Sequence, residues 1–298
     1  MTSAGRFAPS PSGELHVGNL RTAILAWLFA RSTGRQFLMR VEDLDRARAG
    51  AEAGQLRDLA AIGVSWDGRV VRQTDRGPSY AAAIARLSAA GLTYECFCTR
   101  REIQEAPSAP HAPQGAYPGT CRTLTVAERE LKRAVRPAAL RLRSAVTEAT
   151  VQDVLHGSYT GVVDDFVLRR NDGVTAYNLA VVVDDAGQGI DQVVRGDDLL
   201  PSTPRQAYLA SLLNIPSPEY AHVPLVLNAD GARLAKRDGA VTLADLALAG
   251  ITADRVRDAL LDSLGLPAGP LEQVLAVFDP AALPREPWVW PGVERSGA

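Results

Sequence analysis

Residues 6–19 read RFAPSPSGELHVGN, and this stretch decides the expected fold. A short apolar segment from Gly5 to Ala8 runs into a turn rich in proline, serine and glycine, and an apolar helix follows from about Leu20 to Thr33. The order predicts a strand, a tight loop and the N-terminus of a helix. Because a helix N-terminus offers unpaired N–H groups and the positive end of the helix dipole, we expect it to bind a phosphate.

Composition narrows the class of protein. The chain has 298 residues, is 46% hydrophobic and carries a formal charge of −2, which predicts one large or two modest domains with a buried core. It contains no apolar run long enough for a membrane span and no secretory signal pattern. Three cysteines, an odd number, favour a reducing cytoplasm over a disulfide framework. The near-neutral charge argues against a general nucleic-acid binder but allows a local basic patch.

Strand and helix patterns alternate over the first hundred residues, which predicts a parallel sheet with helices on its faces. The expected strands are 37–41, 92–97, 174–183 and 190–194, and the expected helices are 51–62, 79–90 and 204–213. Four prolines between residues 105 and 119 indicate a loop, and short strands over 139–142 and 158–163 indicate a small β insertion. The chain after Gly239 has a largely helical pattern.

Charged residues follow the expected strands, where ligands bind in doubly wound sheets. Glu42 comes directly after one strand and can meet a substrate amino group. Arg195 comes after another, and Arg6 lies in the first one. A guanidinium group binds a carboxylate through two parallel hydrogen bonds, so this pair favours a substrate with carboxylates. Tyr177 falls within the expected strand 174–183, where packing alone explains a tyrosine.

Two further patterns carry chemistry. Cys96-x-Cys98 with Cys121 close by predicts a zinc site that lacks one ligand, for which chemistry alone favours His111. Three ordinary buried thiols remain the alternative. The segment RLAKRDG over 233–239 is a basic turn, from which Lys236 can stabilise charge on a transferring phosphate.

These segments resemble a known family. The stretch 6–19 resembles the signature, ending in His-x-Gly-His, that opens class I aminoacyl-tRNA synthetases, and its Pro-Ser-Pro-Ser-Gly lead resembles the glutamyl branch. Asn19 stands where that signature has a second histidine. The segment 233–239 resembles the second signature, Lys-Met-Ser-Lys-Ser, with Arg233 and Ala235 replacing its first lysine and its serine. The resemblance covers residues 1 to about 240.

The resemblance implies an α/β fold, a Rossmann-type catalytic domain with an inserted subdomain and a short helical stem. The expected parts are the two catalytic halves over 1–95 and 165–240, the zinc-binding and acceptor-like subdomain over 96–164, and the stem over 241–298. Only 59 residues follow Gly239, too few for the helical domain with which a discriminating glutamyl-tRNA synthetase binds the anticodon. Within the branch, the chain therefore resembles the truncated paralogues, the glutamyl-Q tRNA(Asp) synthetases.

The same resemblance implies the functional residues. L-glutamate would be bound by Arg6, Phe7, Ala8, Pro9, Ser10, Glu42, Tyr177 and Arg195. ATP, with Mg²⁺, would be bound by His16, Gly18, Asn19 and Lys236, of which His16 and Lys236 would be catalytic. The paralogues use Cys-x-Cys followed by Tyr-x-x-x-Cys, so the implied ligands of one structural Zn²⁺ are Cys96, Cys98, Tyr117 and Cys121.

The implied activity is tRNA-independent activation of L-glutamate with ATP, followed by transfer of the glutamyl group to queuosine in the anticodon of tRNA(Asp). We expect a cytoplasmic monomer without membrane association. A local basic surface would meet the RNA, and the candidates are Arg100, Arg101, Arg122 and Arg237. The alternatives are charging of a tRNA 3′ end, a small nucleotidyltransferase, and a catalytically silent paralogue that binds glutamate or adenylate.

Overall fold

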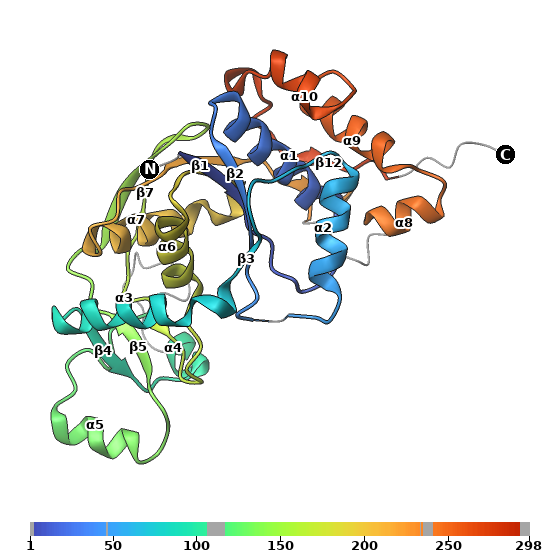
Figure 1. The fold of residues 1–298 in the computed structure, drawn as a ribbon. Helices are drawn as coiled ribbons and strands as arrows, with labels where there is room; N and C mark the ends of the chain where they lie inside the picture. Colours follow the sequence, from blue (N-terminus) through green and yellow to red (C-terminus); the bar gives the residue numbers. More distant parts are fainter. Residues whose placement is uncertain (1–2, 46, 106–116, 233, 235–240, 293–298) are drawn as a thin grey trace.

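The computed structural model describes residues 3–45, 47–105, 117–232, 234 and 241–292 (Figure 1). Its centre is a seven-stranded sheet with the order β3-β2-β1-β9-β10-β6-β7. In chain order these strands are β1 (Ala4–Phe7), β2 (Gln36–Val41), β3 (Val71–Arg72), β6 (Glu148–Asp153), β7 (Gly157–Val162), β9 (Ile190–Gly196) and β10 (Glu219–Val223). Neighbouring strands run parallel except β6 and β7. The carboxyl ends of β1, β2 and β9 therefore meet at one edge, as a Rossmann-type sheet requires for a ligand site.

Helix α1 (Val17–Ser32) is enclosed by the rest of the protein. Its residues are buried on almost every side, which suits a helix that is apolar all round. One side lies on β1, where a Cβ on Gly5 would come within 2.9 Å of the Cβ of Ala30. The helix begins at Val17 rather than near the expected Leu20, because His16 caps it with its side chain.

The other helices are short and lie mainly around the sheet (Figure 1). They are α2 (Ala51–Ala61), α3 (Gly77–Ala89), α4 (Arg100–Glu105), α5 (Val126–Arg133), α6 (Tyr177–Gln188), α7 (Thr203–Leu212), α8 (Leu243–Leu248), α9 (Ala253–Asp262) and α10 (Leu271–Val274). Within the described residues, 3-10 turns cover Gln73–Arg76, Asp197–Ser202, Leu275–Val277 and Pro280–Ala282. The expected helices 51–62, 79–90 and 204–213 are confirmed as α2, α3 and α7.

The expected strand over 174–183 is wrong. Residues 177–183 form the start of α6, and Tyr177 is its first residue rather than a residue within a strand. Residues 179–185 are all buried, and a run that is buried on every side has no periodicity to separate helix from strand. The helix ends at Gly189, whose φ of 69° is the left-handed conformation that glycine adopts readily.

The inserted residues divide into two parts. Strands β4 (Thr93–Cys96), β5 (Ala139–Leu142) and β8 (Val167–Arg169) form a separate antiparallel sheet, so the strand expected over 92–97 does not join the parallel one. Helices α4 and α5 lie beside this small sheet at the lower left of Figure 1. The β6–β7 hairpin, by contrast, joins the main sheet through the parallel pairing of Asp153 with Tyr220.

The described part of the C-terminal segment is largely helical, as expected, and it packs back onto α1 and forms a separate two-stranded sheet. The two-residue strand β12 (Trp288–Val289) pairs with β11 (Val226–Leu227). Arg21 of α1 donates to the Ser263 hydroxyl at 3.0 Å and to the Pro224 carbonyl at 3.0 Å, which joins the stem to α1. Within the described ranges, no helix is long and apolar enough to span a membrane.

Candidate active site

A cavity of about 750 Å³ opens where β1, β9 and the start of α1 meet. It brings together every described residue that the sequence assigned to glutamate or ATP. These residues are Arg6, Phe7, Ala8, Pro9, Ser10, His16, Gly18, Asn19, Glu42, Tyr177 and Arg195. The cavity is large enough for a nucleotide and a small amino acid together.

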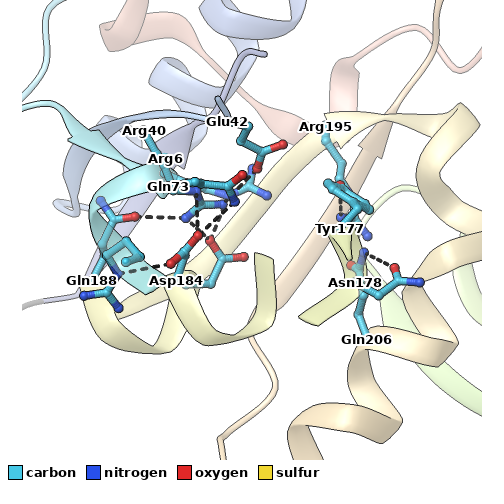
Figure 2. Close-up of polar contacts among 12 residues, drawn as sticks. Arg6, Arg40, Glu42, Gln73, Tyr177, Asn178, Asp184, Gln188, Arg195 and Gln206 are labelled. Atoms are coloured by element: carbon cyan, nitrogen blue, oxygen red, sulfur yellow. Dashed lines mark hydrogen bonds and ion pairs between the residues drawn. The ribbon is translucent and has the colours of Figure 1, made fainter. Parts of the chain in front are cut away.

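One wall of the cavity is a buried network of charges around Asp185, partly drawn in Figure 2. The Nε of Arg6 lies 3.3 Å from Asp185 Oδ1, and the Nη1 of Arg40 lies 2.7 Å from the same oxygen. Burial alone would raise the pKa of Asp185, but Arg40 and Arg6 hold it below its ordinary value. Asp185 therefore stays ionised and fixes both guanidinium groups, and Arg6 is left only 4% exposed.

Glu42 faces the same cavity next to these arginines. Its Oε1 lies 3.4 Å from Arg40 Nη2, in a pair that is almost completely buried. Burial raises the pKa of Glu42, while Arg40 and Arg6 act in the opposite direction. A carboxylate in this position can accept hydrogen bonds from a substrate ammonium group. The positive charge of that ammonium group would favour the ionised form of Glu42.

Arg195 lies across the cavity, beside Tyr177 (Figure 2). Its Nε donates to His222 Nε2 at 3.0 Å, its Nη2 to Thr203 Oγ1 at 2.9 Å and its Nη1 to the Tyr177 hydroxyl at 3.4 Å. The residue is 5% exposed, so its orientation is set by protein groups before any ligand arrives. A guanidinium group has five N–H bonds, which leaves donors for a carboxylate in the cavity.

The N-terminus of α1 forms the other end of the cavity. The His16 Nδ1 accepts from the backbone N–H groups of Gly18 and Asn19, at 3.1 and 3.3 Å. With Nδ1 as an acceptor, the neutral ring carries its proton on Nε2 and can donate from there. A Cβ on Gly18 would lie 3.0 Å from atoms of this ring and 3.3 Å from the Cβ of Val226, so glycine lets the ring keep its place.

The expectation that the first N–H groups of this helix are unpaired is wrong. The N–H groups of Gly18 and Asn19 are occupied by His16, and the N–H of Val17 donates to the Val241 carbonyl at 2.9 Å. The groups at this helix end that can still favour a bound phosphate are the helix dipole and the side chains of His16 and Asn19.

The second signature lies mostly outside the described residues, and this includes Arg233, Ala235, Lys236 and Arg237. Its surroundings are described on both sides. Leu234 is buried and lines the cavity, and Val241 is hydrogen-bonded to the first residue of α1. The residues Leu234 and Val241, which flank the segment that contains Lys236, therefore lie beside the first signature.

A cluster of three cysteines lies in the insertion. The sulfur atoms of Cys96, Cys98 and Cys121 all lie within 4.8 Å of one another, a spacing that a single metal ion can bridge. The Tyr117 hydroxyl oxygen lies 3.3 Å from Cys96 Sγ and 3.8 Å from Cys98 Sγ. Hydrogen bonding from Cys121 lowers the pKa of the Cys96 thiol, which favours a thiolate at that position. His111, the other candidate ligand, lies outside the described residues.

The arginines expected at an RNA surface differ in their surroundings. Arg100 and Arg101 are exposed on α4. Arg122 is engaged within the insertion, because its Nη1 lies 2.6 and 2.8 Å from the two carboxylate oxygens of Asp165. Arg237 lies outside the described residues.

Sequence reasoning missed Arg40, Asp185 and His222, which hold Arg6 and Arg195 in place at the cavity. Their one visible signal was the pair Asp184-Asp185 within an otherwise apolar run, because a buried carboxylate requires a cationic partner. The identity of that partner depends on contacts between residues 145 or more positions apart.

Comparison with known proteins agrees with this architecture. Residues 4–273 match the family model of tRNA synthetases class I (E and Q), catalytic domain. A relative from Nocardia farcinica, named glutamyl-Q tRNA(Asp) synthetase, is 69% identical over 96% of this chain and 92% of its own length. A relative of the same name from Symbiobacterium thermophilum is 46% identical over 95% of this chain and 94% of its own length.

Solved structures with the same fold include two glutamate–tRNA ligases. That of Elizabethkingia meningosepticum, in complex with its amino acid, has a TM-score of 0.83 at 25% identity, and that of Elizabethkingia anophelis has a TM-score of 0.81 at 26% identity. This chain spans 66% and 68% of those two chains, respectively. The fold and the cavity thus correspond to a class I tRNA synthetase catalytic domain. The chain belongs to the class I synthetase family for glutamate and glutamine, within the group whose members are named glutamyl-Q tRNA(Asp) synthetase.

Proposed function

We propose that the protein activates L-glutamate with ATP, without tRNA, and transfers the glutamyl group to queuosine in the anticodon of tRNA(Asp). The observation that carries this proposal is the shared cavity. Two arginines and Glu42 line one end of it, and the capped N-terminus of α1 lines the other. The names of the relatives point to the same activity.

In this proposal the glutamate end binds both charges of the amino acid. Glu42 accepts from the substrate ammonium group, and Arg195, with Arg6, donates to the side-chain carboxylate. Tyr177 and residues Phe7, Ala8, Pro9 and Ser10 close the wall around the amino acid. The α-carboxylate is then directed toward the end of the cavity that binds ATP.

Activation is an in-line displacement. A carboxylate oxygen of glutamate attacks the α-phosphorus of ATP, the bond to the bridging oxygen breaks, and pyrophosphate leaves with its Mg²⁺. The catalytic contribution of the protein is positioning and charge stabilisation. His16 donates from Nε2 to a phosphate oxygen, Gly18 leaves room for the adenine, Asn19 lies beside the phosphates, and Lys236 stabilises the leaving pyrophosphate.

The cysteine cluster is proposed to bind one structural Zn²⁺ through Cys96, Cys98, Cys121 and Tyr117. Three sulfur atoms within bridging distance and a neighbouring phenol oxygen provide the four ligands that structural zinc prefers. The phenol oxygen also accepts from the backbone N–H of Cys121 at 2.8 Å, which fixes its position beside the sulfur atoms. Zinc would fix the loop between β4 and α4.

We retain the division into catalytic halves over 1–95 and 165–240, an insertion over 96–164 and a stem over 241–298 as a proposal. One qualification follows from the sheet order, since the β6–β7 hairpin within the insertion extends the catalytic sheet. The exposed Arg100 and Arg101 are the described candidates for RNA contact. We further propose that the protein acts in the cytoplasm as a monomer.

Glutamate-dependent exchange of pyrophosphate into ATP, measured without tRNA, tests the activation step. We expect exchange with glutamate and much less with glutamine. Exchange that requires tRNA would favour an enzyme that charges a tRNA 3′ end. Binding of glutamate or ATP without any exchange would favour a silent paralogue.

The transfer step is tested with labelled glutamate, ATP and tRNA(Asp) that contains queuosine. Nuclease mapping of the labelled RNA then locates the product. Label on the anticodon fragment supports the proposal, and label on the acceptor fragment contradicts it. A tRNA(Asp) that carries unmodified guanosine at the same position is the matched control and should take up no label.

A further inference from the structure

We propose that the buried residues Asp153 and His222 position Arg195 for binding the substrate carboxylate, by holding His222 in the tautomer whose Nε2 accepts from Arg195. This inference rests on the proposed function in one respect, namely that Arg195 binds the substrate. Asp153 and His222 are positioning residues, because neither lines the cavity among the described residues.

The three residues come from neighbouring strands of the main sheet. Arg195 on β9 and His222 on β10 are directly paired in the parallel register. Asp153 is the last residue of β6, which pairs with β10 on its other side. Arg195 and Asp153 are each 5% exposed, and His222 is 0% exposed. These hydrogen-bonded residues therefore connect the β6–β7 hairpin to the cavity through an almost completely buried path.

The hydrogen bonds allow one tautomer of His222. The Nδ1 of His222 lies 2.6 Å from Asp153 Oδ2, and its Nε2 lies 3.0 Å from Arg195 Nε. A guanidinium Nε–H can only donate, so His222 Nε2 must carry the lone pair and Nδ1 the proton. The hydroxyl of Thr203, 3.0 Å from the same Nε2, can donate to it as well.

Asp153 is itself held in place by backbone groups. Its Oδ1 accepts from the N–H groups of Leu155 and His156 at 2.9 and 3.0 Å, and its Oδ2 accepts from the N–H of His222 at 3.1 Å. Burial would raise the pKa of Asp153, but these bonds and His222 hold it below its ordinary value. Burial lowers the pKa of His222, so the ring is neutral beside an ionised Asp153. Both states agree with the tautomer that the geometry requires.

This arrangement decides which donors of Arg195 face the cavity. With Nε bound to His222 and one Nη2 hydrogen bound to Thr203, the guanidinium plane cannot rotate about its side chain. The remaining N–H bonds are then presented to a ligand in a fixed orientation, which reduces the entropy lost on binding. Loss of the acceptor on His222 would free the plane and also leave a buried Nε–H unsatisfied.

Asp153→Asn is the most direct test, because an amide NH₂ facing Nδ1 would place the histidine proton on Nε2, opposite the Arg195 donor. Nitrogen NMR of histidine-labelled protein reports the tautomer without any assay of activity, and the His222→Gln spectrum identifies the resonances. We expect the wild-type protein to carry the proton on Nδ1, and Asp153→Asn to move it. A wild-type ring protonated on Nε2 would overturn the inference.

Kinetics of pyrophosphate exchange then separate positioning from stability. In Asp153→Asn, we expect the KM for glutamate to rise about tenfold or more while the KM for ATP stays near the wild-type value. Asp165→Asn is the matched control, because Asp165 is another buried carboxylate with several partners, but its partners include Tyr94 and Ser144 rather than residues of the cavity. It should lower stability without changing the KM for glutamate, and an equal rise in both variants would refute a specific role.

Two amide substitutions of His222 distinguish the contact made by its Nε2 from the contact made by its Nδ1. Gln places an amide oxygen near the position of Nε2, whereas the shorter Asn reaches only the position of Nδ1. We therefore expect the KM for glutamate to change by less than about threefold in His222→Gln and by about tenfold or more in His222→Asn. The reverse order, or no change in either variant, would refute the positioning role. A wild-type protein without glutamate-dependent exchange would instead refute the proposed function.

Discussion

His16 and Asn19 cap helix α1 reciprocally. The Nδ1 of His16 accepts from the backbone N–H of Asn19 at 3.3 Å, and the side-chain oxygen of Asn19 accepts from the backbone N–H of His16 at 3.1 Å. This is a capping box, in which each residue satisfies an unpaired donor of the other. The residue that departs from the family signature is therefore part of the structure that orients the histidine.

Asn19→Ala should lower the free energy of unfolding by about 1 kcal/mol, because the capping box loses one of its two acceptors. Asn19→Asp keeps an acceptor and should retain most of the stability, while its negative charge beside the phosphates raises the KM for ATP. Chemical denaturation and exchange kinetics check the two effects. If Asn19→Asp were as unstable as Asn19→Ala, the capping role would be wrong.

Lys236→Ala should reduce the rate of glutamate activation by about a hundredfold or more, as expected for the loss of one donor that acts in the transition state. Glutamate affinity should stay near the wild-type value, because the lysine is assigned to the pyrophosphate. Single-turnover formation of the adenylate measures the rate, and Arg233→Ala is the matched control in the same segment. An unchanged rate in Lys236→Ala would show that the segment is only a basic turn.

The wild-type protein should prefer glutamate over glutamine in kcat/KM by on the order of a thousandfold or more, because a side-chain amide would face the arginine donors with its own NH₂. Arg6→Lys should reduce this preference, since an ammonium group lacks the planar pair of donors. Arg35→Lys changes an ion pair between the residue before β2 and Asp191 of β9, and it serves as the control. Comparable wild-type exchange with the two amino acids would contradict the assignment of Arg6 and Arg195.

The purified protein should contain about one zinc per chain, as for a four-ligand structural site. Metal analysis of Tyr117→Phe and His111→Ala identifies the fourth ligand. We expect zinc to be reduced in Tyr117→Phe and retained in His111→Ala. The opposite result would assign the fourth ligand to His111. If the wild-type protein, purified without chelator, lacked metal, the three cysteines would be ordinary buried thiols.

Stability should decrease as the pH falls below about 6.5, the ordinary pKa of histidine, because of His222. Burial lowers the pKa of His222 in the folded protein, so the unfolded chain binds the proton first and acid favours unfolding. The groups around the ring are Asp153, Arg195, His156 and Tyr220, and Asp153 stays ionised in this range because its pKa is lowered. Denaturant unfolding at about pH 7.5 and about pH 5.5 should show a smaller difference in His222→Gln than in the wild type. An equal difference in the two proteins would exclude His222 as the cause.

The sequence by itself determined the features that depend on neighbouring residues. The first signature combines an apolar segment, a proline-rich turn and a capping residue, and each of these acts over a few positions. The cysteine cluster likewise follows from close spacing along the chain, and the alternation of patterns was enough for the class of fold. The helices α1, α2, α3 and α7 were predicted for the same local reason, since an apolar pattern is visible in the chain and Gly63 and Gly91 follow α2 and α3.

Tertiary structure alone decided the rest. Residues 179–183 show no periodicity because protein encloses them, and packing made the segment from Tyr177 onward a helix whose first residue lines the cavity. The pairing of Asp153 with His222 joins residues 69 positions apart, and that of Arg6 with Asp185 joins residues 179 positions apart. Buried charges are stable only beside a partner, and which partner is available depends on strand order in the folded sheet rather than on distance along the chain.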